Sequence, residues 1–341
     1  MLYFSNDYSY GAHPEVLKRL VETNMVATEG YGEDIFCLRA KEKIKKAIEN
    51  PEAEIFFLAG GTQTNQVVIN SMLQKHQGVI AANTGHIATH EAGAIEFTGN
   101  KVLPIKHIDG KICSDDLRDF LNTFYNDENH SHMVYPGMVY ISFSSEYGTI
   151  YYKDELVSLH NVCKEYQIPL YIDGARLGYG ISAEDSDLNL KDIAENCDVF
   201  YIGGTKIGAL CGEAVVFTKN NVPLCFTTLI KKHGALLSKG RLLGVQFDAL
   251  FTDDLYLKIS KKAVETASCL REGLIKKGYK FFIENKTNQI FIILNNEKLR
   301  KLQEKVVVSF WEKYDETHTV IRLATCWATK KEDVDKLLEI M

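Results

Sequence analysis

Two apolar segments decide the fold: Pro169-Leu170-Tyr171-Ile172-Asp173 and Val199-Phe200-Tyr201-Ile202-Gly203-Gly204-Thr205-Lys206. Each apolar run is short and is bounded by glycine or a charged residue, which predicts a buried strand. Each strand is followed at once, or after a short glycine turn, by one ionisable side chain. The carboxyl ends of parallel strands meet at one edge of a sheet, so we expect Asp173 and Lys206 at the same rim.

A carboxylate and an amine presented together at a sheet rim suit one cofactor, pyridoxal phosphate. Asp173 would keep the ring nitrogen protonated, so that the ring can withdraw electrons. Lys206 would carry the cofactor aldehyde as a Schiff base. The alternative is an ordinary strand-end aspartate and a surface lysine, because such charges mark functional sites only statistically.

The composition is that of a soluble globular protein, and the length allows one large domain and one smaller one. The chain has 341 residues, of which 45% are hydrophobic and 25% are charged. The formal net charge of −6 and the lack of a long basic run argue against nucleic acid as a partner. The first residues lack the basic start and apolar core of a secretory signal. No apolar stretch approaches the ~20 residues of a membrane span, so no membrane partner is expected.

The cysteines and histidines predict neither a disulfide framework nor a metal site. The eight cysteines are scattered without a Cys-x-x-Cys motif, which favours free thiols in the cytoplasm. The ten histidines show no metal-ligand spacing. His130 and His132 lie in a polar segment and are expected to be solvated loop residues.

Strand and helix patterns alternate through the first two-thirds of the chain. Besides the two segments quoted above, the expected strands are residues 55–58, 78–81, 101–104, 138–143 and 213–217. The expected helices are residues 39–49, 62–73, 114–124 (capped by Ser114) and 153–166. This alternation predicts an α/β fold with a mostly parallel sheet covered on both faces.

The pattern changes beyond about residue 235. Residues 242–274 predict one long helix or two, residues 289–294 and 320–323 predict short strands, and residues 331–340 predict a terminal helix. This part is expected to be a small α+β C-terminal domain. The predicted division is an N-terminal segment of residues 1–30, a large cofactor-binding domain of residues 31–240 and a small domain of residues 241–341.

Two further segments should reach the same rim. Gly60-Gly61-Thr62 follows a strand and opens a helix, so its free N–H groups and the Thr62 hydroxyl could bind a phosphate. A plain helix cap is the alternative. His86 follows the next strand and could stack on a cofactor ring and exchange protons with a substrate, or it could be an unperturbed loop histidine.

Two arginines have positions that call for a partner. Arg176 follows Asp173 by three residues, and its rigid fork could bind a carboxylate or phenolate oxygen near the cofactor. Arg322 interrupts the apolar segment Val320-Ile321-Arg322-Leu323, which is costly unless the guanidinium is paired. The partner of Arg322 could be a substrate α-carboxylate, or Arg322 could form a structural ion pair within the protein.

The order of these motifs resembles the threonine aldolase branch of the aromatic amino acid β-eliminating lyase and threonine aldolase family, over essentially the whole chain. The resemblance implies a pyridoxal phosphate-dependent transferase-like fold of type I, with a seven-stranded-type sheet, in a homodimer or homotetramer with shared active sites. By this resemblance, Gly61 and Thr62 correspond to the family's phosphate turn and His86 corresponds to its stacking histidine. Asp173 and Arg176 correspond to its pyridine-binding pair. By the same resemblance, Lys206 corresponds to the Schiff-base lysine and Arg322 to the arginine that binds the α-carboxylate.

The resemblance also implies residues shared between subunits. Tyr31, in Tyr31-Gly32-Glu33-Asp34, matches a tyrosine that reaches a neighbouring site, and Arg241 matches an arginine given to the partner's phosphate. Three departures bear on substrate preference. Asn6 stands in place of a serine near the N-terminus, and the lysine turn is Gly204-Thr205-Lys206-Ile207-Gly208. The segment Ser144-Ser145-Glu146-Tyr147 replaces one that carries a second histidine in many members.

The activity implied is aldol cleavage of a β-hydroxy-α-amino acid, L-threonine or L-allo-threonine, to glycine and an aldehyde through a quinonoid. His86 is the candidate for proton transfer, and Glu91 is expected to be a solvated residue at a helix start. The same scaffold and cofactor also serve β-elimination and transamination, and the sequence does not separate these reactions. A nucleotide-binding or interaction protein without the cofactor is a remote alternative, since no Gly-x-Gly-x-x-Gly fingerprint is present.

Overall fold

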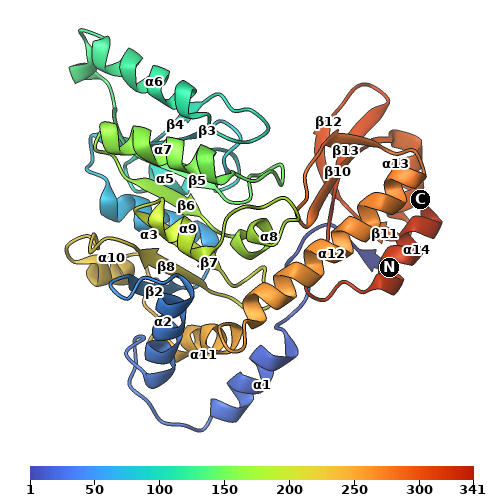
Figure 1. Cartoon of the computed structure of the whole chain (residues 1–341), viewed down its shortest axis with the longest axis horizontal. Helices are drawn as coiled ribbons and strands as arrows, with labels where there is room; N and C mark the ends of the chain where they lie inside the picture. The colour runs from blue at the N-terminus through green and yellow to red at the C-terminus, as the bar shows by residue number, and fades with distance from the viewer.

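The computed structural model describes all 341 residues, and its centre is a seven-stranded sheet (Figure 1). The strand order is β2-β8-β7-β6-β5-β3-β4. The strands are β2 (Glu54–Leu58), β3 (Gln77–Ala82), β4 (Lys101–Ile105), β5 (Tyr135–Ser142), β6 (Leu170–Asp173), β7 (Val199–Gly203) and β8 (Glu213–Phe217). Only β8 runs antiparallel to its neighbours, so the prediction of a mostly parallel sheet is confirmed.

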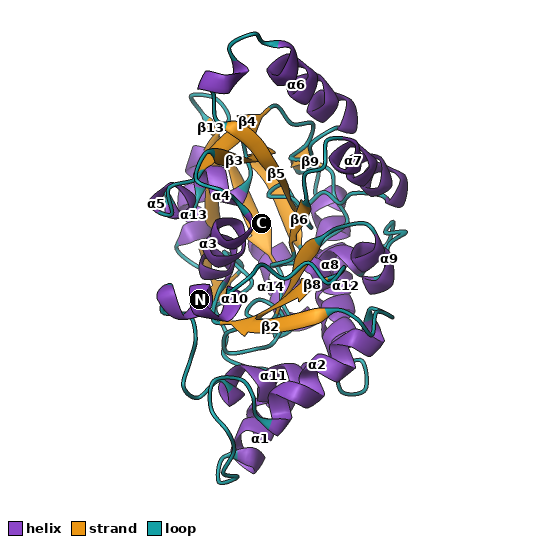
Figure 2. Ribbon diagram, turned by 90° about the vertical axis from the view of Figure 1, so that its left-hand side faces the viewer, coloured by secondary structure: helices purple, strands orange, loops and turns teal.

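Helices cover both faces of this sheet (Figure 2). One face carries α3 (Gly61–Met72), α4 (His86–Thr89), α5 (Ala94–Phe97) and α10 (Phe226–Lys232). The other carries α6 (Ser114–Asn126), α7 (Lys153–Glu165), α8 (Leu177–Ile181), α9 (Leu190–Glu195) and the 3-10 turn η1 (His130–His132) after α6. Successive strand residues alternate between the two faces, so Tyr171 packs in the core under α3 and Ile172 in the opposite core.

A second, antiparallel sheet lies beside the C-terminal helices. Its order is β12-β13-β10-β9, with β9 (Lys280–Ile283), β10 (Gln289–Asn295), β12 (Ser309–Lys313) and β13 (His318–Ala324). Helices α13 (Asn296–Gln303) and α14 (Lys331–Ile340) accompany it and share a separate apolar core. This part is the predicted α+β region. The N-terminal strand β1 (Leu2–Tyr3) joins it by pairing with β11 (Val306–Val307).

The helices agree with the sequence prediction in some places and differ from it in others. Residues 242–274, predicted as one long helix or two, form two helices, α11 (Arg241–Leu250) and α12 (Leu255–Lys276), because Asp253 and Asp254 adopt positive φ between them. Helix α1 (Pro14–Thr23) was not predicted, and α2 (Ile35–Ala47) begins earlier because the Asp34 carboxylate caps it. The prediction that Ser114 caps α6 is wrong, since Cys113 holds that position without a side-chain bond.

The three-part domain division stays a prediction. Helix α11 packs against α1 and α2, and α12 runs from this group toward the small sheet (Figure 1). No helix combines the length and the apolar composition needed to cross a bilayer.

Candidate active site

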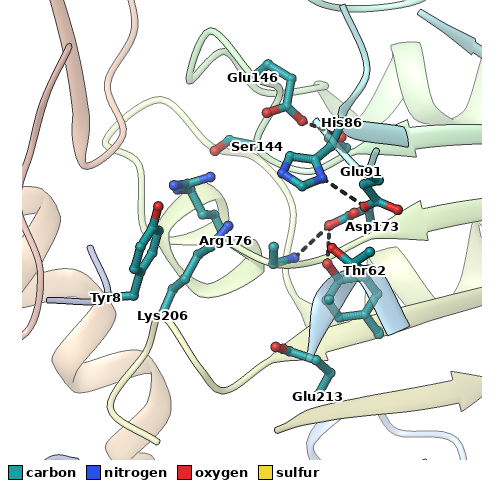
Figure 3. Close-up of a pocket in the computed structure, with 14 residues that line it drawn as sticks. Tyr8, Thr62, His86, Glu91, Ser144, Glu146, Asp173, Arg176, Lys206 and Glu213 are labelled. Carbon is teal, nitrogen blue, oxygen red and sulfur yellow. Dashed lines mark hydrogen bonds and ion pairs between the residues drawn. The ribbon is translucent and has the colours of Figure 1, made fainter. Parts of the chain in front are cut away.

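A pocket opens where the parallel strands of the large sheet end (Figure 3). Its volume is about 700 Å³, part of it open to solvent. It is lined by Tyr8, Gly61, Thr62, His86, Glu91, Ser142, Ser144, Glu146, Asp173, Ala175, Arg176, Tyr201, Lys206 and Glu213. Six predicted residues from four separate stretches of the sequence therefore line one cavity: Gly61, Thr62, His86, Asp173, Arg176 and Lys206.

Asp173 is a buried carboxylate that is held by four hydrogen bonds. The donors are the hydroxyls of Tyr140 (2.7 Å) and Tyr201 (2.5 Å), the amide of Asn65 (2.9 Å) and the backbone N–H of Ala175 (3.0 Å). Burial alone would raise the pKa of Asp173, but His86 and these hydrogen bonds lower it overall. The group is therefore kept as a fixed negative charge in the pocket wall.

His86 begins the short helix α4 and is oriented by a buried glutamate. Its Nδ1 lies 2.8 Å from Oε1 of Glu91, and that oxygen also accepts a bond from Asn65 (2.7 Å). Burial favours the neutral ring, but the hydrogen bond to Glu91 and the charges of Glu146 and Asp173 raise the pKa of His86. The prediction of a solvated Glu91 is wrong, because this residue is only 4% exposed.

Lys206 emerges from the turn that follows β7. Burial, and then the positive charge of Arg176, lower the pKa of its amine, which favours the neutral and nucleophilic form. The turn needs glycine on steric grounds. A Cβ at Gly203 would come within 2.5 Å of the backbone oxygen of Ala175, and one at Gly204 within 2.7 Å of that of Gly212.

The start of α3 faces the pocket through Gly61 and Thr62. Gly60 precedes the helix as its N-cap with extended backbone and makes no side-chain cap bond. Thr62 lies inside the helix, so it does not act as the cap that was the alternative for this motif. Free N–H groups at this helix start, together with the Thr62 hydroxyl, are a suitable donor set for an anion.

Arg176 is buried in an ion pair that the sequence did not predict. Its Nε and Nη2 donate to the two carboxylate oxygens of Asp7 at 2.7 and 3.0 Å. Asn288 donates a third bond to Asp7 at 2.9 Å. Burial alone would raise the pKa of Asp7, but Arg176, Lys206 and these hydrogen bonds lower it to about 2. The N-terminal segment is thereby attached to the pocket wall, and Tyr8 comes to line the cavity.

Arg322 lies on β13 beside the pocket and has no acidic partner. It donates to Oε1 of Gln289 and to the backbone oxygen of Ser5, both at 3.1 Å, and its Nε is buried without a partner. Its guanidinium lies 5.6 Å from the ring centre of Trp311. Burial, and then the charge of Arg176, lower the pKa of Arg322. The structural ion pair that was one alternative for Arg322 does not form.

Three further predicted residues, like Arg322, are not among those that line this pocket. Asn6 turns its side chain back on its own segment, where its Oδ1 accepts bonds from Tyr8 N–H and the Ser9 hydroxyl, both at 2.9 Å. Tyr31 is 50% exposed, and Arg241 donates to the backbone oxygens of Thr23 and Val26. Their predicted roles stay predictions.

Several residues in the pocket or bonded to its lining escaped the sequence analysis. Three tyrosines of β5, β6 and β7 surround Asp173, since Tyr171 donates to Asn65 (2.7 Å) while Tyr140 and Tyr201 donate to the carboxylate. The sequence did contain a signal for these tyrosines. Each stands two residues before the end of its strand, so the three share one face of the sheet. Asp7, Glu146 and Glu213 had no comparable signal.

The fold and the pocket place the chain in a known class of enzymes. The chain belongs to the beta-eliminating lyase family, whose model matches residues 7–305. Its fold is that of the type I enzymes such as aspartate aminotransferase from Thermus thermophilus, with a TM-score of 0.72 at 13% identity over 100% of this chain and 90% of the other.

Two relatives make the similarity more specific. The structure of a threonine aldolase from Leishmania major has 38% identity and a TM-score of 0.96, over 100% of this chain and 98% of the other. A low specificity L-threonine aldolase from Pseudomonas aeruginosa is 29% identical over 308 residues, which are 89% of this chain and 87% of that protein. The predicted family is therefore confirmed.

Proposed function

We propose that this protein cleaves a β-hydroxy-α-amino acid, L-threonine or L-allo-threonine, to glycine and an aldehyde with bound pyridoxal phosphate. The observation that carries the proposal is one pocket in which an amine with a lowered pKa, Lys206, lies with an ionised carboxylate, Asp173. The names of the two relatives above favour this reaction over β-elimination and transamination.

The residues of the pocket fit this cofactor. The N-terminus of α3 with Gly61 and Thr62 would hold the phosphate, Asp173 the ring nitrogen and Lys206 the aldehyde. A Cβ at Gly61 would come within 3.1 Å of the Tyr201 hydroxyl, so the lack of a side chain there leaves the turn open to an anion. When bound, the cofactor supplies an electron sink for the electron pair released at the substrate Cα.

The side chains of this chain then have distinct roles. Arg322, with no acidic partner of its own, would bind the substrate carboxylate. Asp173 would keep the cofactor ring protonated, and His86 would cover the ring and transfer protons. Arg176 would fix an oxygen of the cofactor or the substrate while its other side holds Asp7, and Asn6 would position the N-terminal segment beside the substrate.

We further propose that the enzyme is a homo-oligomer, a dimer or tetramer, in which Tyr31 and Arg241 serve the neighbouring site. Apolar side chains gather on α1, α2 and the segments that join and follow them, where a monomer would expose them to water. They are Leu17, Val21, Met25, Val26, Ile35 and Leu38, with exposures from 45% to 90%. All eight cysteines are free thiols, which supports a cytoplasmic location.

The deciding experiment is to incubate the protein, loaded with pyridoxal phosphate, with L-threonine and L-allo-threonine in parallel. Equimolar acetaldehyde and glycine are the expected products. The ratio of the rates with the two substrates measures how well the enzyme accepts either configuration at Cβ. Pyruvate and ammonia from serine, without acetaldehyde, would instead assign β-elimination. A protein that takes up no cofactor would overturn the proposal.

A further inference from the structure

Glu146 differs from the other acidic residues of the pocket in having a carboxylate oxygen that is free to bind a ligand. It follows β5 and lines the cavity on the same side as Ser144 and His86 (Figure 3). Its Oε1 accepts a bond from the Ser142 hydroxyl at 3.0 Å. No protein hydrogen bond or ion pair occupies Oε2, and this oxygen is not sealed away from the cavity.

The oxygens of the other carboxylates in the pocket already accept hydrogen bonds or are buried. Both oxygens of Asp173 accept hydrogen bonds, and the oxygens of Glu213 accept from Gly204 N–H (3.1 Å) and the Thr205 hydroxyl (2.8 Å). Glu91 holds His86 through Oε1, and its Oε2 is buried out of reach. Glu146 is thus the acidic residue in this pocket that can take a new proton without breaking an existing interaction.

Its position relative to the charged groups is also defined. The negative charge of Glu146 contributes to raising the pKa of both His86 and Lys206, which means that it lies within electrostatic reach of each. Burial lowers the pKa of His86, but Glu91, Glu146 and Asp173 raise it overall. Because Nδ1 of His86 is held by Glu91 while Oε2 of Glu146 has no protein partner, Glu146 is the better placed proton acceptor.

We propose that Glu146 is the base that accepts the proton of the substrate β-hydroxyl during carbon–carbon cleavage. This inference rests on the proposed function. The O–H bond breaks as its proton goes to Oε2, and its electron pair forms the carbonyl of the aldehyde. The Cα–Cβ bond breaks, its electron pair stays with Cα, and Cα receives a proton, which gives glycine. In this scheme His86 is the donor of the proton to Cα.

The Ser142 hydroxyl supports Glu146 in this role. It bonds to Glu146 on one side and lies 3.2 Å from the Tyr140 hydroxyl, which donates to Asp173. The base is therefore positioned by the same hydrogen-bond network that fixes the cofactor-facing carboxylate. The segment 144–147 lacks the second histidine expected from the family, and Glu146 provides a proton acceptor from this same segment.

The test compares Glu146→Gln with Glu146→Asp in the cofactor-loaded enzyme, with Glu272→Gln on the exposed side of α12 as the control. Two reactions are measured, cleavage of L-threonine and exchange of the α-proton of glycine for deuterium, since only the first needs a base for a hydroxyl. We expect Glu146→Gln to lower kcat for cleavage by about 10²–10⁴-fold. Its KM and its glycine exchange should stay close to wild type, and Glu146→Asp should keep part of the cleavage activity.

A second readout needs no cofactor. In the cofactor-free protein, an NMR titration of His86 should give a lower pKa in Glu146→Gln than in wild type, because a negative charge beside the imidazole is lost. Unchanged cleavage in Glu146→Gln, an equal loss of cleavage and exchange, or an unmoved His86 titration would each overturn the role of Glu146. Failure of the wild-type enzyme to cleave L-threonine would instead overturn the proposed function.

Discussion

The pocket at the rim of the large sheet and the apolar surface formed by α1 and α2 are built in opposite ways. In the pocket, polar groups from distant parts of the chain satisfy one another, as where Asp173 accepts four hydrogen bonds from within the same chain. On the α1–α2 surface, Met25 is 90% exposed and Val21 is 69% exposed, with nothing from the chain to cover them. One chain satisfies the polar groups of the first region, whereas it leaves the apolar side chains of the second region exposed.

Tyr31 and Arg241 belong to the second of these two regions, the one with the exposed apolar surface. Both come from the part of the chain around α1, α2 and α11, and neither lines the pocket. The comparison shows that one chain assembles the pocket by itself, whereas the proposed roles of Tyr31 and Arg241 would need a neighbouring subunit. The predictions below test each side of this comparison.

The largest effect is expected at Lys206. Lys206→Ala should abolish turnover while the fold is kept, because the amine is the group that would bind the cofactor covalently. Borohydride should no longer fix the cofactor to the protein, which mass spectrometry measures. Lys301→Ala, on exposed α13, is the control and should behave as wild type. Steady-state activity in Lys206→Ala would refute the assignment.

The second effect concerns the ion pair that attaches the N-terminal segment to the pocket. Asp7→Asn should lower the free energy of unfolding by about 3–5 kcal/mol, because it leaves the buried Arg176 charge without its partner. Denaturant titration measures this loss. The double variant Asp7→Asn/Arg176→Gln is the control, and it should be destabilised less than Asp7→Asn. Equal losses in both variants would mean that the pairing itself is unimportant.

The pH dependence of this pair has a defined sign. The pKa of Asp7 in the folded protein is about 2, below its ordinary value of 3.8, so its stabilisation is present above about pH 4 and is lost as the pH falls toward 2. Asp7→Asn should therefore remove part of the acid sensitivity of wild type between these pH values.

The third effect tests the exposed surface. Val21→Glu/Met25→Glu should weaken self-association by about 100-fold or more, since each 1.4 kcal/mol is a factor of ten and buried charges cost several times that. Analytical ultracentrifugation measures the change. Phe310→Glu, at a 66% exposed position on β12, is the control. If the monomer so produced keeps full activity, Tyr31 and Arg241 do not serve a neighbouring site.

The smallest effect is expected at Glu213. Burial raises the pKa of this acid from 4.5 to about 8, although the Thr205 hydroxyl acts against the shift. Between these pH values the unfolded chain loses the proton while the folded protein keeps it, so rising pH should reduce the stability of the cofactor-free protein. Glu213→Gln should flatten this slope in urea titrations, and Glu272→Gln should leave it unchanged. An unaltered slope in Glu213→Gln would contradict the raised pKa.

Much of the fold could be predicted from the sequence because its signals are local. Buried strands such as 170–173 and 199–203 carry continuous apolar runs, and their carboxyl ends point to one rim once the sheet is parallel. That reasoning placed Asp173, His86 and Lys206 in one pocket. It missed α1, although that helix is strongly amphipathic and begins at Pro14, and it missed the early start of α2, where the Asp34 cap lies outside the apolar pattern.

The amino-acid sequence by itself determined the parallel sheet, the strand-end amine and carboxylate, and the glycine turns that bring backbone close to the pocket. These follow from local apolar periodicity and from the steric freedom of glycine. Only the tertiary structure decided that Asp7 pairs with Arg176, that Glu91 is buried against His86, and that Glu146 keeps an oxygen free. Those partners lie between 4 and 169 positions apart along the chain, and hydrogen-bond pairing and burial at such separations depend on packing that no local pattern encodes.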